Sequence, residues 1–303
     1  RLDGAQSTGA NQLIGGAGDD TYVLGAGDVA IELAGGGVDT VITSENQTLS
    51  DTLENLTLTG SNATSGTGNA GNNSIDGSQN SAANVLIGLA GDDTYYVDDV
   101  DVITETIDGG MDTAVVMGTA YTLHDNVENL TIAASAGAAQ GTGNALNNVL
   151  TGNDYDNRLD GGIGADTMRG GRGFDTYVVD NSGDVIEDDS GYDTVETGMS
   201  YTLSNGIENL VLTGSVAIAG TGNSLGNVLD GSQNSAANLL AGGLGDDEYI
   251  LGVGDTIAEG INEGIDRVQV AESYTLGDNL EYLWLRGSAS INASGNVLDN
   301  ELV

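Results

Sequence analysis

The sequence predicts an all-β fold, a parallel β-roll or β-solenoid built from 18-residue coils and arranged as four long repeats. Three observations predict this fold. A long segment recurs four times, a nine-residue unit recurs within it, and the chain has 49 Gly residues but no Pro. Repeats of fixed period are typical of architectures in which each unit packs only on its neighbours.

The long repeat is marked by an Asp residue that precedes a Tyr at equivalent places. This Asp recurs as Asp20, Asp93, Asp175 and Asp247. The middle interval is nine residues longer than the first, which points to a smaller unit of nine. We divide the chain, as one continuous solenoid, into repeats 1–76, 77–151, 152–230 (with one extra nonapeptide) and 231–303.

The nine-residue unit is clearest in residues 143–178, which read GNALNNVLT, GNDYDNRLD, GGIGADTMR and GGRGFDTYV. It returns at 15–23, 88–96 and 242–250. Each unit starts with a Gly-rich turn, because Gly reaches the backbone angles that tight turns need. Three extended residues follow, and the apolar middle one points inward. Two units make one coil, and coils stack as parallel strands ~4.8 Å apart.

An uncharged octapeptide, GSQNSAAN, occurs at 77–84 and again at 231–238, and the related GAQSTGAN occupies 4–11. Its last residue falls at position 6 of a nonapeptide whose turn carries two extra residues. We interpret it as a lengthened turn at the joint between long repeats. Whether these Asn-containing turns bind metal stays open at this point.

The acidic residues are stacked in columns. The chain has 46 acidic residues, six Arg and no Lys, for a formal charge of −40. Carboxylates ~5 Å apart at an effective dielectric near 20 repel by roughly 3 kcal/mol per pair. Oxygen-rich glycine turns with carboxylates suit Ca²⁺, which would supply the missing positive charge. The pairs one coil apart are Asp20–Asp39, Asp93–Asp112, Asp166–Asp184, Asp175–Asp193 and Asp247–Asp266.

The sequence GGxGxD followed by an extended triplet resembles the nonapeptide of RTX (repeats-in-toxin) proteins, and the long unit resembles the extended repeats of large secreted RTX proteins. The resemblance implies Ca²⁺ held by the position-6 Asp and by turn carbonyls. The implied carbonyl ligands are Gly15, Ala17, Gly88, Ala90, Gly161, Ile163, Gly170, Arg172, Gly242 and Leu244. Two departures from the pattern weaken it locally: Leu89 replaces the second Gly of its turn, and Glu248 stands where other turns have Thr.

Further acids recur in turns that face a position-6 Asn one coil earlier. Because Asn offers one uncharged acceptor oxygen, we expect either a weaker calcium site or a solvated edge. These acids are Asp28 with Glu32, Asp101 with Glu105, Asp255 with Glu259, and Asp184 with Glu187.

Several other functions are disfavoured. Six Arg cannot form a nucleic-acid surface, and no apolar run reaches the ~20 residues of a membrane-spanning helix. His124 is the only His and there is no Cys, so neither a zinc centre nor a catalytic triad can be assembled. We therefore expect no enzyme activity. The Tyr residues at position 8 are expected in the core rather than in a sugar-binding platform.

Two classes of function remain. The first is a calcium-binding structural module of a secreted or cell-surface bacterial protein, such as an adhesin, surface layer or extracellular filament, that folds on Ca²⁺ outside the cell. The second is an accessory domain of a type I-secreted enzyme, such as a protease, lipase or alginate epimerase. Partners besides calcium would be a second copy of the chain or the extracellular matrix. The chain opens in mid-pattern at Arg1, so we expect an excerpt of a longer protein.

Overall fold

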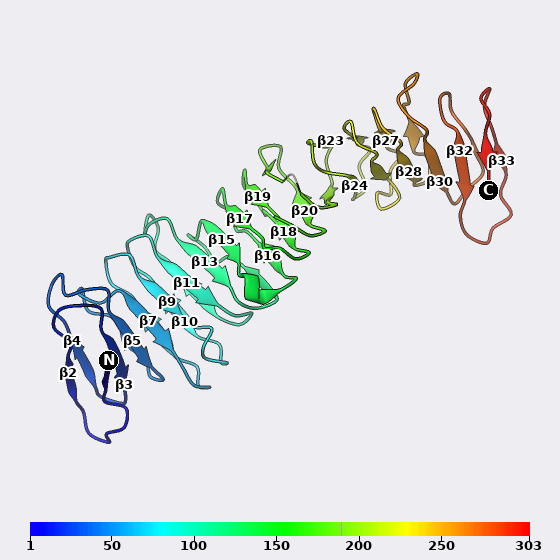
Figure 1. Ribbon diagram of the computed structural model, residues 1–303. Helices are drawn as coiled ribbons and strands as arrows, with labels where there is room; N and C mark the ends of the chain where they lie inside the picture. Colours follow the sequence, from blue (N-terminus) through cyan, green and yellow to red (C-terminus); the bar gives the residue numbers. More distant parts are fainter. Residues whose placement is uncertain (189) are drawn as a thin grey trace. The chain divides into compact units, whose positions relative to one another are not determined.

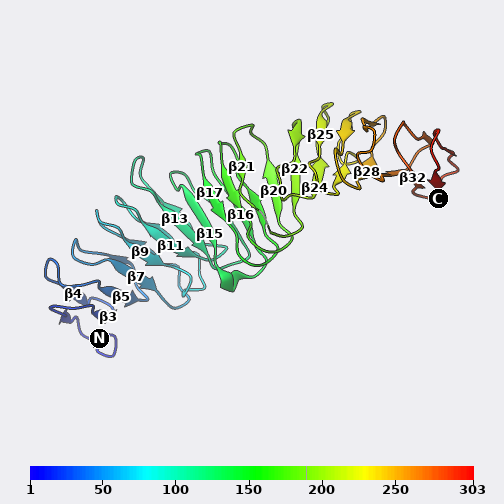
Figure 2. The same ribbon diagram turned by 45° about the horizontal axis from the view of Figure 1, so that its top comes forward.

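The computed structural model describes residues 1–188 and 190–303, and it is a parallel β-solenoid (Figure 1). Short strands alternate with turns along the whole described chain, and Figure 2 shows the coils following one another in sequence order. The helical element among the described residues is a single 3₁₀ turn, η1 (Ala134–Ala136). The predicted fold class is confirmed. No described helix has the length and apolar character to cross a membrane.

The chain divides into two compact units. The first comprises Arg1–Asn153 and Gly161–Thr167, and the second comprises Asp154–Asp160 and Met168–Val303.

In the first unit, every second strand belongs to one parallel sheet: β1 (Leu2–Asp3), β3 (Thr21–Leu24), β5 (Thr40–Thr43), β7 (Asn55–Leu58), β9 (Ser74–Asp76), β11 (Thr94–Val97), β13 (Thr113–Val116), β15 (Asn129–Ile132) and β17 (Val149–Thr151). The strands between them lie on the other side of each coil. One short sheet pairs β2 (Gln12–Ile14) with β4 (Val29–Ile31), and another contains β6 (Gln47–Thr48), β8 (Ser65–Thr67), β10 (Val85–Ile87) and β12 (Val102–Thr104). Strands β14 (Ala120–Thr122) and β16 (Gln140–Thr142) also pair in parallel, as the first two strands of a longer sheet.

The second unit repeats this arrangement. Its main sheet contains β18 (Arg158–Asp160), β20 (Thr176–Val179), β22 (Thr194–Thr197), β24 (Asn209–Leu212), β26 (Val228–Asp230), β28 (Glu248–Leu251), β30 (Arg267–Val270), β32 (Tyr282–Leu285) and β34 (Glu301–Leu302). The strands between them are β21 (Val185–Ile186); a four-stranded sheet of β23 (Tyr201–Thr202), β25 (Ala219–Thr221), β27 (Leu239–Ala241) and β29 (Thr256–Ile257); and the pair β31 (Tyr274–Thr275) and β33 (Ala293–Ser294). Strand β19 (Thr167–Arg169) lies where the two units divide.

The core is a set of apolar columns that run from coil to coil. In β3, alternate residues are buried, and Tyr22 pairs with Val41, which pairs with Leu56 in the next coil. All three side chains are at most 1% exposed. This alternation is what a strand with one buried face requires. The four position-8 Tyr side chains are fully buried, which confirms that they are core residues: Tyr22, Tyr95, Tyr177 and Tyr249.

The coils are not all 18 residues long. Backbone-to-side-chain contacts between neighbouring coils join residues 19 apart at Asp20, 15 apart at Asp39, 20 apart at Asn73 and 18 apart at Asn157. The coil after Asp39 is short because its return segment lacks a Gly-rich nonapeptide turn. The coil that contains the octapeptide is long because of the two extra turn residues.

Candidate metal centre

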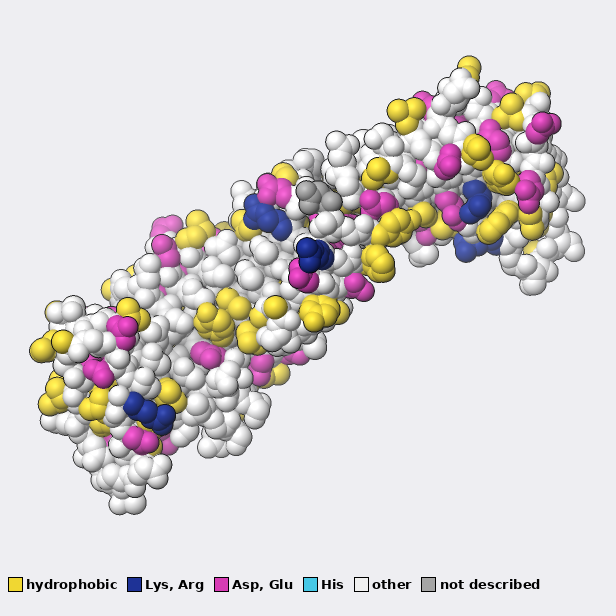
Figure 3. Space-filling view, viewed as in Figure 1, with side chains coloured by type: hydrophobic (Ala, Val, Ile, Leu, Met, Phe, Trp, Pro, Cys, Tyr) yellow, Lys and Arg dark blue, Asp and Glu magenta, His cyan; other side chains and the backbone are white. Residues whose placement is uncertain are grey.

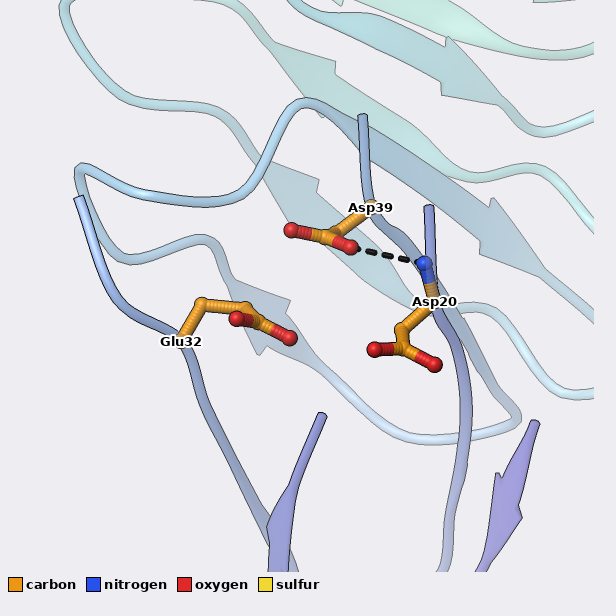
Figure 4. Close-up of side chains that lie close together, drawn as sticks. All are labelled: Asp20, Glu32 and Asp39. Carbon is orange, nitrogen blue, oxygen red and sulfur yellow. Dashed lines mark hydrogen bonds between the residues drawn. The ribbon is translucent and has the colours of Figure 1, made fainter. Parts of the chain in front are cut away.

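Three acidic side chains meet at one place in each long repeat, and we call each group a carboxylate cluster. Within a cluster, one oxygen of every carboxylate lies within 4.8 Å of one oxygen of each of the others. Figure 4 shows the first cluster, where two turn Asp side chains and a Glu from another strand point toward one another. The clusters are Asp20–Glu32–Asp39, Asp93–Glu105–Asp112, Asp175–Asp188–Asp193 and Asp247–Glu259–Asp266.

The two Asp residues of a cluster end consecutive turns, directly before paired strands. Asp93 precedes β11 and Asp112 precedes β13, one coil later. The Asp93 backbone N–H donates to Asp112 Oδ1 at 2.8 Å, and the Asp112 N–H donates to Glu128 Oε2 at 2.9 Å. The same chain of contacts links Asp247, Asp266 and Glu281. One oxygen of each carboxylate is thus fixed by the backbone, which leaves Oδ2 to face the cluster.

The third carboxylate of each cluster follows a short strand on the other side of the coil. Glu105 follows β12, and the buried Tyr95 hydroxyl donates a hydrogen bond to its Oε1. Tyr22 contacts Glu32, Tyr177 contacts Asp188 and Tyr249 contacts Glu259 in the same way. Each hydroxyl lies on a fully buried ring, so the core itself positions the third carboxylate.

Most cluster Asp residues have one buried oxygen that accepts no hydrogen bond. Among the described residues, the Oδ2 atoms of seven cluster Asp residues are buried and accept no hydrogen bond: Asp39, Asp93, Asp112, Asp175, Asp193, Asp247 and Asp266. Unpaired buried carboxylates are costly, and proteins normally pair them or bind metal to them. In contrast, the acids on the face drawn in Figure 3 are scattered among neutral side chains. The clusters therefore fit a bound cation.

The first Gly of each turn leaves room for such an ion. A Cβ built on Gly88 would collide with the oxygens of Asp93, Glu105 and Tyr95, and one on Gly242 would collide with those of Asp247. Neither Gly has a positive φ, so backbone conformation does not require Gly there. Gly is required because a Cβ would fill the space beside the carboxylates.

Burial raises the pKa of several cluster carboxylates. It raises the pKa of Asp93 to about 7 and that of Asp112 to about 6, with further contributions from neighbouring acids. Burial likewise raises the pKa of Asp175 and Asp266 to about 6, and the pKa of Asp193, Asp247 and Glu259 to about 7. It also raises the pKa of Tyr95. A divalent cation would reverse this preference by favouring the charged forms.

Eight of the ten Asp residues proposed as ligands lie in the clusters. Asp166 and Asp184 do not belong to a three-acid group among the described residues. Asp166 Oδ1 accepts the Asn148 backbone N–H at 2.7 Å, and Asp184 Oδ2 accepts the Asn181 N–H of its own turn at 3.1 Å.

The proposed carbonyl ligands fall into two sets. The first glycine of each strict turn lies beside a ligand Asp: Gly15, Gly88, Gly161, Gly170 and Gly242. The third residue of each turn exposes its side chain, so only its backbone could contribute: Ala17, Ala90, Ile163, Arg172 and Leu244.

The third acid of each cluster lies at a different turn from the one expected from the sequence. Asp28 and Glu32 were expected to face the same Asn turn. The structure places Asp28 against Asn11 but Glu32 against Asp20, because β4 separates them and carries the Glu to the opposite edge. In the third repeat the cluster residue is Asp188, while Glu187 forms an ion pair with Arg169 at 2.6 Å. The signal that could have found them is the three-residue strand between the two acids.

A parallel β-solenoid with carboxylate clusters at its glycine turns defines a class of calcium-binding repeat protein. The family model described as the RTX calcium-binding nonapeptide repeat matches four copies, within residues 7–29 and 142–177. These segments contain the turns of Asp20, Asp166 and Asp175. These matches and the parallel β-solenoid fit an RTX-type repeat protein, whose nonapeptide family is calcium-binding. No curated protein matches the chain.

Proposed function

We propose that this chain is a calcium-folded structural module of a secreted or cell-surface bacterial protein, such as an adhesin, a surface layer or an extracellular filament. The observation that carries the proposal is the set of buried, unpartnered Oδ2 atoms in the carboxylate clusters. A folded chain without cations holds these acids at a cost, whereas an unfolded chain leaves them in water.

The residues that would hold each ion are two turn Asp side chains and one Glu or Asp that follows a short strand on the other side of the coil. Bound Ca²⁺ would offset two of the three negative charges of the cluster and join two consecutive coils through their carboxylates. The protein contributes the rest: backbone N–H groups fix each Asp, and the Tyr hydroxyl fixes the third acid. The ion thereby supports the same coil contacts that bury the apolar columns.

We propose that the module folds and functions outside the cell. Extracellular calcium modules bind with dissociation constants of about 10⁻⁴–10⁻³ M, which leaves such sites empty in the cytoplasm and filled outside. An acidic chain that stays unfolded inside suits export through a type I secretion system, as the RTX family resemblance implies. The structural role is supported by repetition, because the same acids recur in four repeats instead of converging on one unique site. We propose no catalytic role for this segment.

Calcium titration followed by circular dichroism tests the proposal. The chain in EGTA is expected to lack the β-sheet signal, to gain it cooperatively between about 10⁻⁴ and 10⁻³ M Ca²⁺, and to lose it again on chelation. Mg²⁺ at the same concentration is the control, because it demands a smaller octahedral site and retains its water. A full β-sheet signal in EGTA would contradict calcium-coupled folding.

A further inference from the structure

Many turns of the solenoid are closed by Asn side chains instead of acids. After β8, the Asn69 amide Nδ2 donates to the carbonyls of Ser50 and Leu53, each at 2.7 Å. Asn73 Nδ2 donates to the carbonyls of Leu53 and Glu54 at 3.3 and 3.2 Å, and its Oδ1 accepts the Asn69 N–H. The two Asn amides therefore donate hydrogen bonds to the carbonyls that the preceding coil presents at this edge.

This arrangement recurs once in each long repeat. Asn144 and Asn148 donate to carbonyls of the preceding coil, including those of Val127 and Glu128. The corresponding pairs are Asn69 with Asn73, Asn144 with Asn148, Asn223 with Asn227, and Asn296 with Asn300.

The octapeptide turn is closed by a similar device. Asn84 is fully buried, and its Nδ2 donates to Ala82 O at 2.8 Å and to Asp101 Oδ1 at 2.9 Å. Its Oδ1 accepts from both the backbone N–H and the hydroxyl of Thr64. Asp101 also accepts the Asn84 and Asp98 N–H groups. Asn11 with Asp28 and Asn238 with Asp255 repeat the amide-to-carboxylate contact.

In these turns, the amide N–H takes the place beside the oxygen atoms that a cation would take in the carboxylate clusters. It is the positive end of a dipole, and it meets the carbonyl and carboxylate oxygens that calcium would need as ligands. An ion entering the octapeptide turn would have to displace these hydrogen bonds, and it would meet one carboxylate where a carboxylate cluster offers three. Calcium affinity decreases as the number of charged ligands decreases, so a turn with one carboxylate favours the amide over the ion.

We propose that each carboxylate cluster binds one Ca²⁺, four in all, and that neither the amide-closed turns nor the turn of Asp166, which has no three-acid group among the described residues, takes an ion. The proposal rests on the proposed function, since it assigns the calcium to the clusters. The solenoid then contains two kinds of joint between coils. The cluster joints depend on calcium, and the amide-closed joints are complete without it.

Equilibrium dialysis of the whole chain against calcium measures the number of bound ions directly. We expect four ions per chain at saturation. A number above four, approaching one for each pair of stacked turns, would overturn the proposal while leaving calcium binding intact. No bound calcium at all would instead refute the proposed function, so the two failures are distinguishable.

Matched variants separate the two kinds of joint. Asp93→Asn combined with Asp112→Asn should lower the count from four ions to three. Asn84→Ala should keep four ions but lower the urea midpoint in saturating calcium, because a buried amide network is lost. Asn223→Ala, which alters a partly buried amide of another amide-closed turn in the second unit, should also keep four ions and serves if Asn84→Ala does not fold. Loss of an ion from either Asn variant would show that the amide-closed turns bind metal.

Discussion

At the scale of single residues, Gly88 contributes to the binding site because it has no Cβ. A methyl group there would enter the space shared by the Asp93 and Glu105 oxygens, and the backbone itself would accept Ala. Gly88→Ala is therefore expected to remove one of four calcium ions while the other clusters stay filled, as equilibrium dialysis would measure. Gly198→Ala is the control, because its Cβ would have its nearest neighbour 3.7 Å away. If Gly88→Ala retained all four ions, the space beside Gly88 would not be needed for calcium binding.

The cluster carboxylates also predict the pH dependence of the calcium-free chain. The pKa of Asp93 and that of Asp247 rise from 3.8 to about 7 on folding because burial disfavours the charged form. The folded chain therefore binds more protons than the unfolded chain between these values. The stability from this uptake is fully present below pH 3.8 and is lost as pH rises through about 7.

Circular dichroism in EGTA should accordingly show more folded chain at pH 5 than at pH 8. Calcium should act in the opposite sense, because protons compete with the ion for the same oxygens. Its apparent affinity is expected to fall as pH drops below about 7, the pKa of Asp93. Equal folding at pH 5 and pH 8 in EGTA would show that these carboxylates do not titrate with folding.

At the scale of elements, the strand pattern of the solenoid is readable from its sequence. An extended triplet with an apolar centre predicts a strand with one buried face, and β11 follows this pattern with Tyr95 inward and its neighbours less buried. The stacking of Asp93 on Asp112 is equally predictable, since their separation equals one coil. These features are local or periodic, so a repeat unit contains all the information they need.

The composition of each cluster is less predictable, because it depends on where the return strand crosses the coil. Glu105 reaches Asp93 because β12 carries the chain to the opposite edge of the coil and Tyr95 holds the Glu105 carboxylate. A uniform 18-residue coil places Glu105 near Asn84, one turn away from its actual partner. Unequal coil lengths, such as the 15-residue step from Asp39 to Glu54, cannot be derived from the nonapeptide period.

At the scale of the whole molecule, each long repeat carries a complete set of joints. It has one carboxylate cluster, one pair of closing Asn residues and the strands between them. The joint at the octapeptide is also the same in both copies: Asn84 binds Asp101 as Asn238 binds Asp255. Strand β9 pairs with β11 as β26 pairs with β28, through Ile75–Tyr95 and Leu229–Tyr249.

Removal of residues 77–230 should therefore leave a folded chain. The deletion joins Asp76 to Gly231 and recreates the native junction of Asp230 with Gly231. The shortened chain keeps the clusters of Asp20 and Asp247 and should bind two calcium ions, measured by dialysis alongside circular dichroism. A control deletion of 77–234 cuts into the octapeptide and should fold poorly. Failure of the first deletion to fold would show that distant repeats support each other.

The identical octapeptides also have a consequence for how such a gene can change. Recombination between two copies of the same coding segment exchanges or removes whole repeats, and the products meet at a turn whose hydrogen bonds are already complete. Each such event then adds or subtracts two long repeats together with their two metal sites. A lineage could in this way vary the length of the protein and its calcium demand in proportion, without passing through a misfolded intermediate.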